Sequence, residues 1–234
     1  MTAKKIPEII DLSQEIYDRM PVYKKLPEVK IEVHATHEEW QNLPSNNKTP
    51  SVLKLQMGEH TGTHVDALSH MGIPYKTHSI DKMPLNTFLT SAFCLDFSHK
   101  ELGELIEPEE LIEACKTSKN RIQEGDTVLI RTDHYKKHFG SASWAKGPGL
   151  SAKATRWLGE QKIAAFGVET MSPGVTGISN KEVHTICGEM GFTHYENLIN
   201  LDLLTSRTRF QFIGLPLKIR GGTGSPVRAV AVFY

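Results

Sequence analysis

The chain has 234 residues, and its 27 Lys and Arg balance its 27 Asp and Glu, so the formal net charge is zero. A chain of this length fits one large domain, and we expect residues 1–234 to form one. A neutral chain has no long-range field to recruit nucleic acid or an anionic membrane, so the expected partner is a small molecule.

The N-terminal residues MTAKKIPEIIDLSQ have no apolar segment typical of a secretory leader, and no apolar run approaches membrane-spanning length. The cysteines, Cys94, Cys115 and Cys187, are odd in number and widely spaced, which is typical of a reducing compartment. We therefore expect a cytoplasmic protein with no membrane partner.

Expected strands and helices are interspersed along the chain. Short apolar runs predict strands at Glu8–Leu12, Ser51–Met57, Ala92–Phe97, Thr127–Arg131, Ile163–Val168, Phe210–Leu217 and Val227–Phe233. Helical patterns with suitable first turns predict helices at Pro108–Lys116, Ser151–Gln161 and Asn180–Met190. Because strands outnumber helices without strict alternation, the sequence predicts an α/β mixed-sheet domain with a strongly curved sheet, not a doubly wound parallel sheet.

Three segments have the composition of connections. Residues 43–50, LPSNNKTP, predict a surface loop. The glycine-rich residues 221–224 predict a turn between two terminal strands, because no phosphate-binding pattern follows a predicted strand. The stretch from Lys30 to Pro50 is rich in His and acidic residues, and two interpretations stay open: a lid over a pocket, or a solvated surface loop anchored by Trp40.

The strongest chemical signal lies in residues 60–70, HTGTHVDALSH. His60, His64, Asp66 and His70 occupy even positions, so an extended segment would present all of them on one side. A helix would turn Asp66 away from the histidines, and Gly62 disfavours a helix. Imidazole and carboxylate donors suit Zn²⁺ or Mn²⁺, and a carboxylate can bridge two ions. The pattern predicts a divalent metal site and allows two ions in it.

This pattern, His-x-Gly-Thr-His-x-Asp with a further histidine four residues on, resembles the signature of the metal-dependent cyclase family that includes bacterial kynurenine formamidase and isatin hydrolase. Four other segments also resemble sequence motifs of this family: Asp11–Ser13, Gly149–Ser151, Gly167–Thr170 and Leu215–Lys218. The resemblance therefore covers nearly the whole chain. It implies one domain with a barrel-like mixed sheet and flanking helices, of the swivelling β/β/α type.

The resemblance also implies roles for single residues. His60 and His64 would hold one divalent ion, and His184 would hold the other. Asp66 and Glu196 would bridge or cap the two ions, and His70 would transfer protons. The family likeness further implies a homo-oligomer, for which we expect a dimer. Four other histidines are interpreted as surface or structural residues: His78, His99, His138 and His194.

The chain departs from the family pattern at two positions. Leu68 stands where the family has proline, and Tyr23 stands where formamidases of this type have a tryptophan that lines the pocket. We interpret Tyr23 as a substrate contact. The expected activity is hydrolysis of a small amide by metal-activated water, first of all that of an arylformamidase. A hydrolase of a cyclic amide or lactone, such as isatin, is the nearest alternative, and a non-catalytic metal-stabilised binding module is one of another class.

Overall fold

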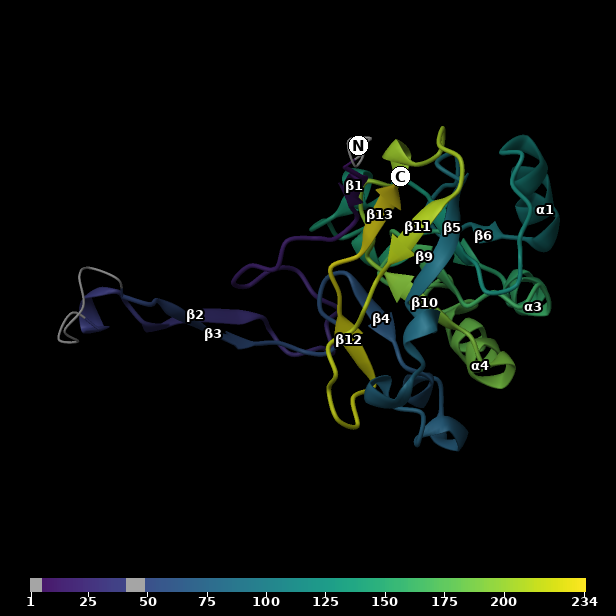
Figure 1. Cartoon of the computed structure of the whole chain (residues 1–234). Coiled ribbons are helices and arrows are strands. Elements are labelled where there is room, and N and C mark those ends of the chain that lie inside the picture. Colours follow the sequence, from purple (N-terminus) through teal and green to yellow (C-terminus); the bar gives the residue numbers. More distant parts are fainter. Residues whose placement is uncertain (1–5, 41–48) are drawn as a thin grey trace.

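A nine-stranded mixed sheet forms the centre of the computed structural model, which describes residues 6–40 and 49–234 (Figure 1). The strand order is β1-β13-β11-β5-β7-β9-β10-β4-β12. The nine strands, in chain order, are β1 (Glu8–Asp11), β4 (His64–Asp66), β5 (Leu89–Asp96), β7 (Thr127–Arg131), β9 (Ala165–Val168), β10 (Thr193–Glu196), β11 (Phe210–Ile213), β12 (Gly224–Pro226) and β13 (Val230–Phe233). The sheet curls into a half-barrel, which confirms the predicted mixed α/β fold and curved sheet.

The four central strands, β5, β7, β9 and β10, run parallel, and the flanking strands are antiparallel. Parallel strands are usually covered on both faces and are correspondingly apolar. In β5, Phe93 and Leu95 pack into the core beneath the helices, whereas Ala92 and Cys94 pack into the core inside the curl of the sheet. The sheet is therefore buried on both sides at its centre.

Three helices cover the outer face of the sheet: α1 (Pro108–Thr117), α3 (Ala152–Glu160) and α4 (Asn180–Met190) (Figure 1). Helix α1 begins with a reciprocal capping box between Glu107 and Glu110, and the Ser151 hydroxyl accepts the Ala154 N–H at the start of α3. The two-strand sheet of β6 (Leu105–Ile106) and β8 (Gly149–Leu150) completes this side. A short helix, α2 (His134–His138), follows β7. No helix in the described part of the chain is long and apolar enough to cross a membrane.

The glycine-rich turn at residues 221–224 is shorter than expected. Gly224 opens strand β12, which pairs with β4 at the edge of the sheet. A Cβ on Gly224 would lie 2.7 Å from the His60 ring and 2.9 Å from the Val65 carbonyl oxygen. The absence of a side chain at Gly224 therefore allows β12 to lie directly against the segment that carries the histidine cluster.

A two-stranded arm, made by β2 (Lys30–Ala35) and β3 (Val52–Gln56), projects from the rest of the chain (Figure 1). The expectation of a loop is wrong for residues 30–35, which form a strand. Apolar and polar residues alternate in their sequence, KIEVHA, as is typical of a strand. Neither strand lines the pocket near the histidine cluster, which does not support the lid interpretation for the described residues. The Trp40 side chain and most of the predicted loop at 43–50 lie outside the described residues.

A buried carboxyl, Glu169, follows strand β9. Its Oε2 accepts the backbone N–H groups of Thr132 and Asp133, each at 2.5 Å, whereas Oε1 has no hydrogen-bond partner in the described part of the chain. Burial raises the pKa of Glu169 from its usual 4.5 to about 7. This carboxyl therefore binds its proton more tightly in the folded protein than in the unfolded chain.

The raised pKa of Glu169 makes stability depend on pH. Its stabilising contribution is complete below about pH 4.5 and is lost as the pH rises through about 7. The full effect is on the order of 3 kcal/mol, since each tenfold change in proton affinity is worth about 1.4 kcal/mol. We expect Glu169→Gln to flatten the decline in the free energy of unfolding between pH 5 and 8, measured by urea denaturation. An identical pH profile for the two proteins would contradict this assignment.

Candidate metal centre

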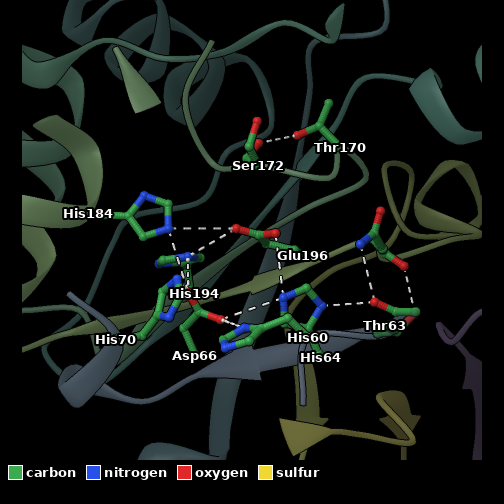
Figure 2. A network of polar contacts seen from close by, with 12 residues as sticks. His60, Thr63, His64, Asp66, His70, Thr170, Ser172, His184, His194 and Glu196 are labelled. Carbon is green, nitrogen blue, oxygen red and sulfur yellow. Dashed lines mark hydrogen bonds and ion pairs between the residues drawn. The ribbon is translucent and has the colours of Figure 1, made fainter. Parts of the chain in front are cut away.

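The neighbouring strands β4 and β10 bring the predicted site residues together. Their antiparallel register sets Glu196 opposite His64, and the same register places His194 level with Asp66. Val65 and Tyr195 point into the core inside the curl, so His64, Asp66, His194 and Glu196 share the opposite face. His184 reaches this face from α4, and Figure 2 shows the imidazole rings converging on the two carboxylates.

Each carboxylate divides its two oxygens between different histidines. Asp66 Oδ1 lies 2.7 Å from His60 Nδ1 and 3.5 Å from His64 Nε2, whereas its Oδ2 lies 3.6 Å from His184 Nε2. Glu196 Oε2 lies 3.5 Å from His64 Nε2, and its Oε1 lies 3.9 Å from His184 Nε2. Two carboxylates that face two sets of histidines have the arrangement needed to bridge a pair of cations.

Hydrogen bonds outside the cluster fix which nitrogen each histidine presents. His64 Nδ1 donates to the Gly62 carbonyl at 2.9 Å, and His184 Nδ1 donates to the Asn180 carbonyl at 2.8 Å. Both rings therefore direct an unprotonated Nε2 into the cluster, as a metal ligand requires. Burial lowers the pKa of His64, which favours the neutral imidazole that binds metal. Gly62 has φ of +60°, a conformation that favours glycine in this turn.

His60 is oriented by a polar chain at the edge of the sheet. Its Nε2 lies 3.1 Å from the Thr223 hydroxyl, and that hydroxyl donates to Glu59 Oε2 at 2.7 Å. Because the hydroxyl proton points to Glu59, the Thr223 oxygen accepts from His60 Nε2. This leaves His60 Nδ1 to face Asp66, so the presented nitrogen differs from that of His64 and His184.

His70 lies at the rim of the cluster. Its Nε2 is 3.7 Å from Asp66 Oδ2, and its side chain is 40% exposed, whereas that of Asp66 is 1% exposed. It is the last residue of the single turn Leu68–His70, in which Leu68 replaces the proline of the family pattern. Burial lowers the pKa of His70, so the neutral imidazole is favoured near neutral pH. This position suits proton transfer at the mouth of the site better than coordination.

One residue of the cluster was not expected from the sequence. His194, interpreted as surface or structural, is fully buried, and its Nε2 lies 3.3 Å from both Asp66 Oδ2 and Glu196 Oε1. Its signal was the spacing in His194-x-Glu196, which places both side chains on one face of a strand. The short run THYE lacks the apolar alternation that predicts a strand, so this spacing was not recognised.

The donor atoms form two groups that fit metal ions. The three-ligand group contains His60, His64 and Asp66, and the four-ligand group contains Asp66, His184, His194 and Glu196. Within each group the donor atoms lie within 4.8 Å of one another. Imidazole nitrogens and carboxylate oxygens are the ligands that Zn²⁺ and Mn²⁺ accept. The residues present therefore fit divalent ions.

A pocket of about 260 Å³ opens onto the cluster. One wall carries the polar side chains of the cluster, including His60, His70 and Glu196. An apolar wall of the pocket is formed by Pro21, Val22, Tyr23, Leu26, Trp144 and Met171. The structure thus places Tyr23 in the pocket lining, where an aromatic residue was expected. A small molecule with an apolar body and one polar group would fit this lining.

Known proteins resemble this chain over most of its length. The family model Cyclase, described as "Putative cyclase", matches residues 10–175. Isatin hydrolase of Roseibium aggregatum is 26% identical over 245 residues, covering 96% of this chain and 91% of that protein. Kynurenine formamidase of Bacillus thuringiensis strain Al Hakam is 28% identical over 228 residues, covering 97% and 98%. The solved structure of isatin hydrolase A from Labrenzia aggregata bound to benzyl benzoate superposes with a TM-score of 0.83, at 28% identity and coverage of 97% and 94%.

Proposed function

The chain belongs to the cyclase family, and we propose that it is a metal-dependent hydrolase that cleaves a small amide at the pocket above the histidine cluster. The observation that carries the proposal is the pair of carboxylates, Asp66 and Glu196, whose oxygens face two different sets of histidines. The names of the similar proteins, isatin hydrolase and kynurenine formamidase, support hydrolysis as the reaction.

We propose two divalent ions, Zn²⁺ or Mn²⁺, with His60 and His64 at one ion, His184 at the other, Asp66 shared by the two, and Glu196 capping the ion at His184. When bound, such ions polarise a carbonyl group and lower the pKa of a coordinated water. The two carboxylates give the ligand set negative charge that offsets the charge of two cations. A cluster of neutral histidines alone would have no such charge. Both carboxylates are buried, so their electrostatic interactions are strong.

The side chains around the cluster have separate tasks in this proposal. Tyr23, Leu26 and Trp144 hold an aromatic substrate against the apolar wall, so that its carbonyl faces the cluster. His70, at the rim, accepts a proton from the attacking water as a neutral imidazole and passes it to the departing nitrogen. An acid/base side chain outside the ligand set argues against a purely structural metal site, which would need only ligands.

We propose arylformamidase activity as the first candidate, with opening of a cyclic amide as the second. Both reactions place a carbonyl beside an aromatic ring, and the pocket of about 260 Å³ is of a size for such a molecule. The test is to assay N-formylkynurenine and isatin separately with the purified protein supplied with Zn²⁺ or Mn²⁺. Turnover of one substrate with kcat/KM at least about 10⁴ M⁻¹s⁻¹ supports the proposal. Turnover of neither would favour the binding-module alternative.

We propose that the arm joins two copies of the chain into a dimer. Ile31 and Val33 pair with Leu55 and Leu53, so one face of the arm is apolar, and Val33, Leu53 and Leu55 are each more than half exposed. The other face is polar and carries the ion pair of Lys54 and Glu32 at 3.6 Å. A lone two-stranded ribbon with an exposed apolar face is only marginally stable in water. A second copy of the chain would cover that face.

Light scattering after gel filtration tests the dimer. We expect a mass of twice the 26.2 kDa of one chain, and a shift toward one chain when Val33 and Leu53 are both replaced by Ser. The matched control is Lys54→Ser on the opposite face of the same arm, which should leave the mass unchanged. A mass of one chain before any substitution, or a mass that the double substitution does not change, would refute the role of the arm.

We also propose that the protein works in the cytoplasm. Cys94, Cys115 and Cys187 are free thiols, and two of them are buried. Free buried cysteines are typical of a reducing compartment, which supports this location.

A further inference from the structure

The role of His194 goes beyond the ligand set that the family resemblance implies. The side chain is fully buried, and neither ring nitrogen has a hydrogen-bond partner among the residues that the structure describes. Burying an imidazole without a partner for either nitrogen is costly, so such a group calls for an explanation. The Nε2 atom of His194 faces the cluster, between Asp66 and Glu196 (Figure 2).

The spacing of His194 from its neighbours is that of metal ligands around one point. Ligand atoms at about 2.0–2.1 Å from a tetrahedral Zn²⁺ lie about 3.3–3.4 Å from one another. His194 Nε2 lies 3.3 Å from Asp66 Oδ2 and 3.3 Å from Glu196 Oε1. The distances from His184 Nε2 to the same two oxygens are 3.6 and 3.9 Å. Four donor atoms thus surround a space of the size that one such ion occupies.

The ring of His194 is held in this orientation by its neighbours. It stacks on Phe166 with ring centroids 5.5 Å apart and an interplanar angle of 29°. It also meets the His184 ring edge to face, with centroids 4.8 Å apart at 86°. Since β10 fixes the backbone and the ring packs against Phe166 and His184, Nε2 is aimed at the cluster before any ligand arrives.

We propose that His194 is a metal ligand, and that the four-ligand group therefore holds its ion more tightly than the three-ligand group does. This inference rests on the proposed dinuclear site and assigns different tasks to its two halves. A site closed by four protein ligands is typical of structural ions, whereas three ligands leave a position open for water or substrate. The ion held by His60, His64 and Asp66 is then the one that receives the substrate carbonyl. The pocket lining includes all three of these residues, whereas the four-ligand group has one member, His194, that the pocket does not reach.

Zn²⁺ titration of chelator-stripped protein, followed by calorimetry, tests this assignment. The unsubstituted protein is expected to bind two ions per chain in two separate steps, one tight and one weaker. His194→Phe keeps a flat ring against Phe166 but removes the nitrogen, and it should weaken the tight step by at least about 100-fold while leaving the second step. His194→Asn gives a second variant with a polar group too short to reach the cluster, and circular dichroism verifies that each variant is folded.

The matched control is His134→Phe. His134 is also buried, but its Nε2 donates to the Trp144 carbonyl at 2.7 Å, away from the cluster. Both binding steps should survive in this control. If the His194 variants bind both ions with unchanged affinities, the inference is wrong. It is also wrong if the unsubstituted protein binds metal in a single step and the His194 variants show the same step. Two metal-binding steps without hydrolysis of either amide would instead refute the proposed activity and leave the role of His194 standing.

Discussion

Replacing His70 with Ala is expected to lower kcat by about 10²- to 10⁴-fold, the usual contribution of a positioned acid/base group. Metal content and Tm should change little, because His70 belongs to neither group of ligand atoms and its side chain is 40% exposed. The nearest carboxylate oxygen, Asp66 Oδ2, is 3.7 Å from its Nε2, too far for a hydrogen bond. The measurement is steady-state kinetics on metal-loaded protein, with metal content determined on the same sample.

His78→Ala is the control for this experiment, because His78 is an exposed histidine of the same connection and does not line the pocket. It should keep both kcat and the metal content. Loss of an ion together with activity in His70→Ala would make His70 a ligand and refute its assignment to proton transfer.

Replacing Asp66 with Asn is expected to weaken both metal-binding steps and to reduce kcat/KM by at least about 10³-fold. Asp66 is the residue that both ligand groups share, and its two oxygens face different histidines. Although burial opposes ionisation, the imidazoles of His194, His184 and His60 hold the pKa of Asp66 well below its usual range. Asparagine keeps the shape of the side chain but provides neither the charge nor a second oxygen.

Glu169→Gln is the matched control for Asp66→Asn, since Glu169 is another buried carboxyl but accepts backbone N–H groups outside the cluster. The control should bind two ions, whatever its effect on the pH dependence of stability. Metal content can be measured by plasma mass spectrometry after dialysis. An Asp66→Asn protein that retains both ions at full occupancy would contradict the bridging role.

Much of the cluster was predictable because its signal is local. His60, His64, Asp66 and His70 lie within 11 residues, and Val65 and Ala67 between them are buried in the opposite direction, as alternation requires. The helix around His184 was predicted with the observed bounds, Asn180–Met190. The bounds of strand β7 were also those expected, Thr127–Arg131.

The missed features depend on pairing between distant segments. Strand β10 has four residues and β4 has three, too few for a periodic pattern, and only their pairing places His194 beside Asp66. Strand β11 ends at Ile213 instead of the predicted Leu217, where Gly214 and Pro216 interrupt the pattern. The first strand of the arm had a local signal, since Ile31, Val33 and Ala35 alternate with polar residues. The His-rich and acidic composition of the stretch favoured a loop instead, so the strand was not predicted.

The central claim is that bound divalent ions make this protein a hydrolase, and reversible removal of metal tests it most directly. Hydrolysis of N-formylkynurenine and of isatin should be measured on one preparation as purified, after dialysis against a chelator, and after readdition of Zn²⁺ or Mn²⁺ at two ions per chain. We expect activity on one substrate to fall at least about 10³-fold on chelation and to return on readdition. Full activity in folded, metal-free protein would contradict the account.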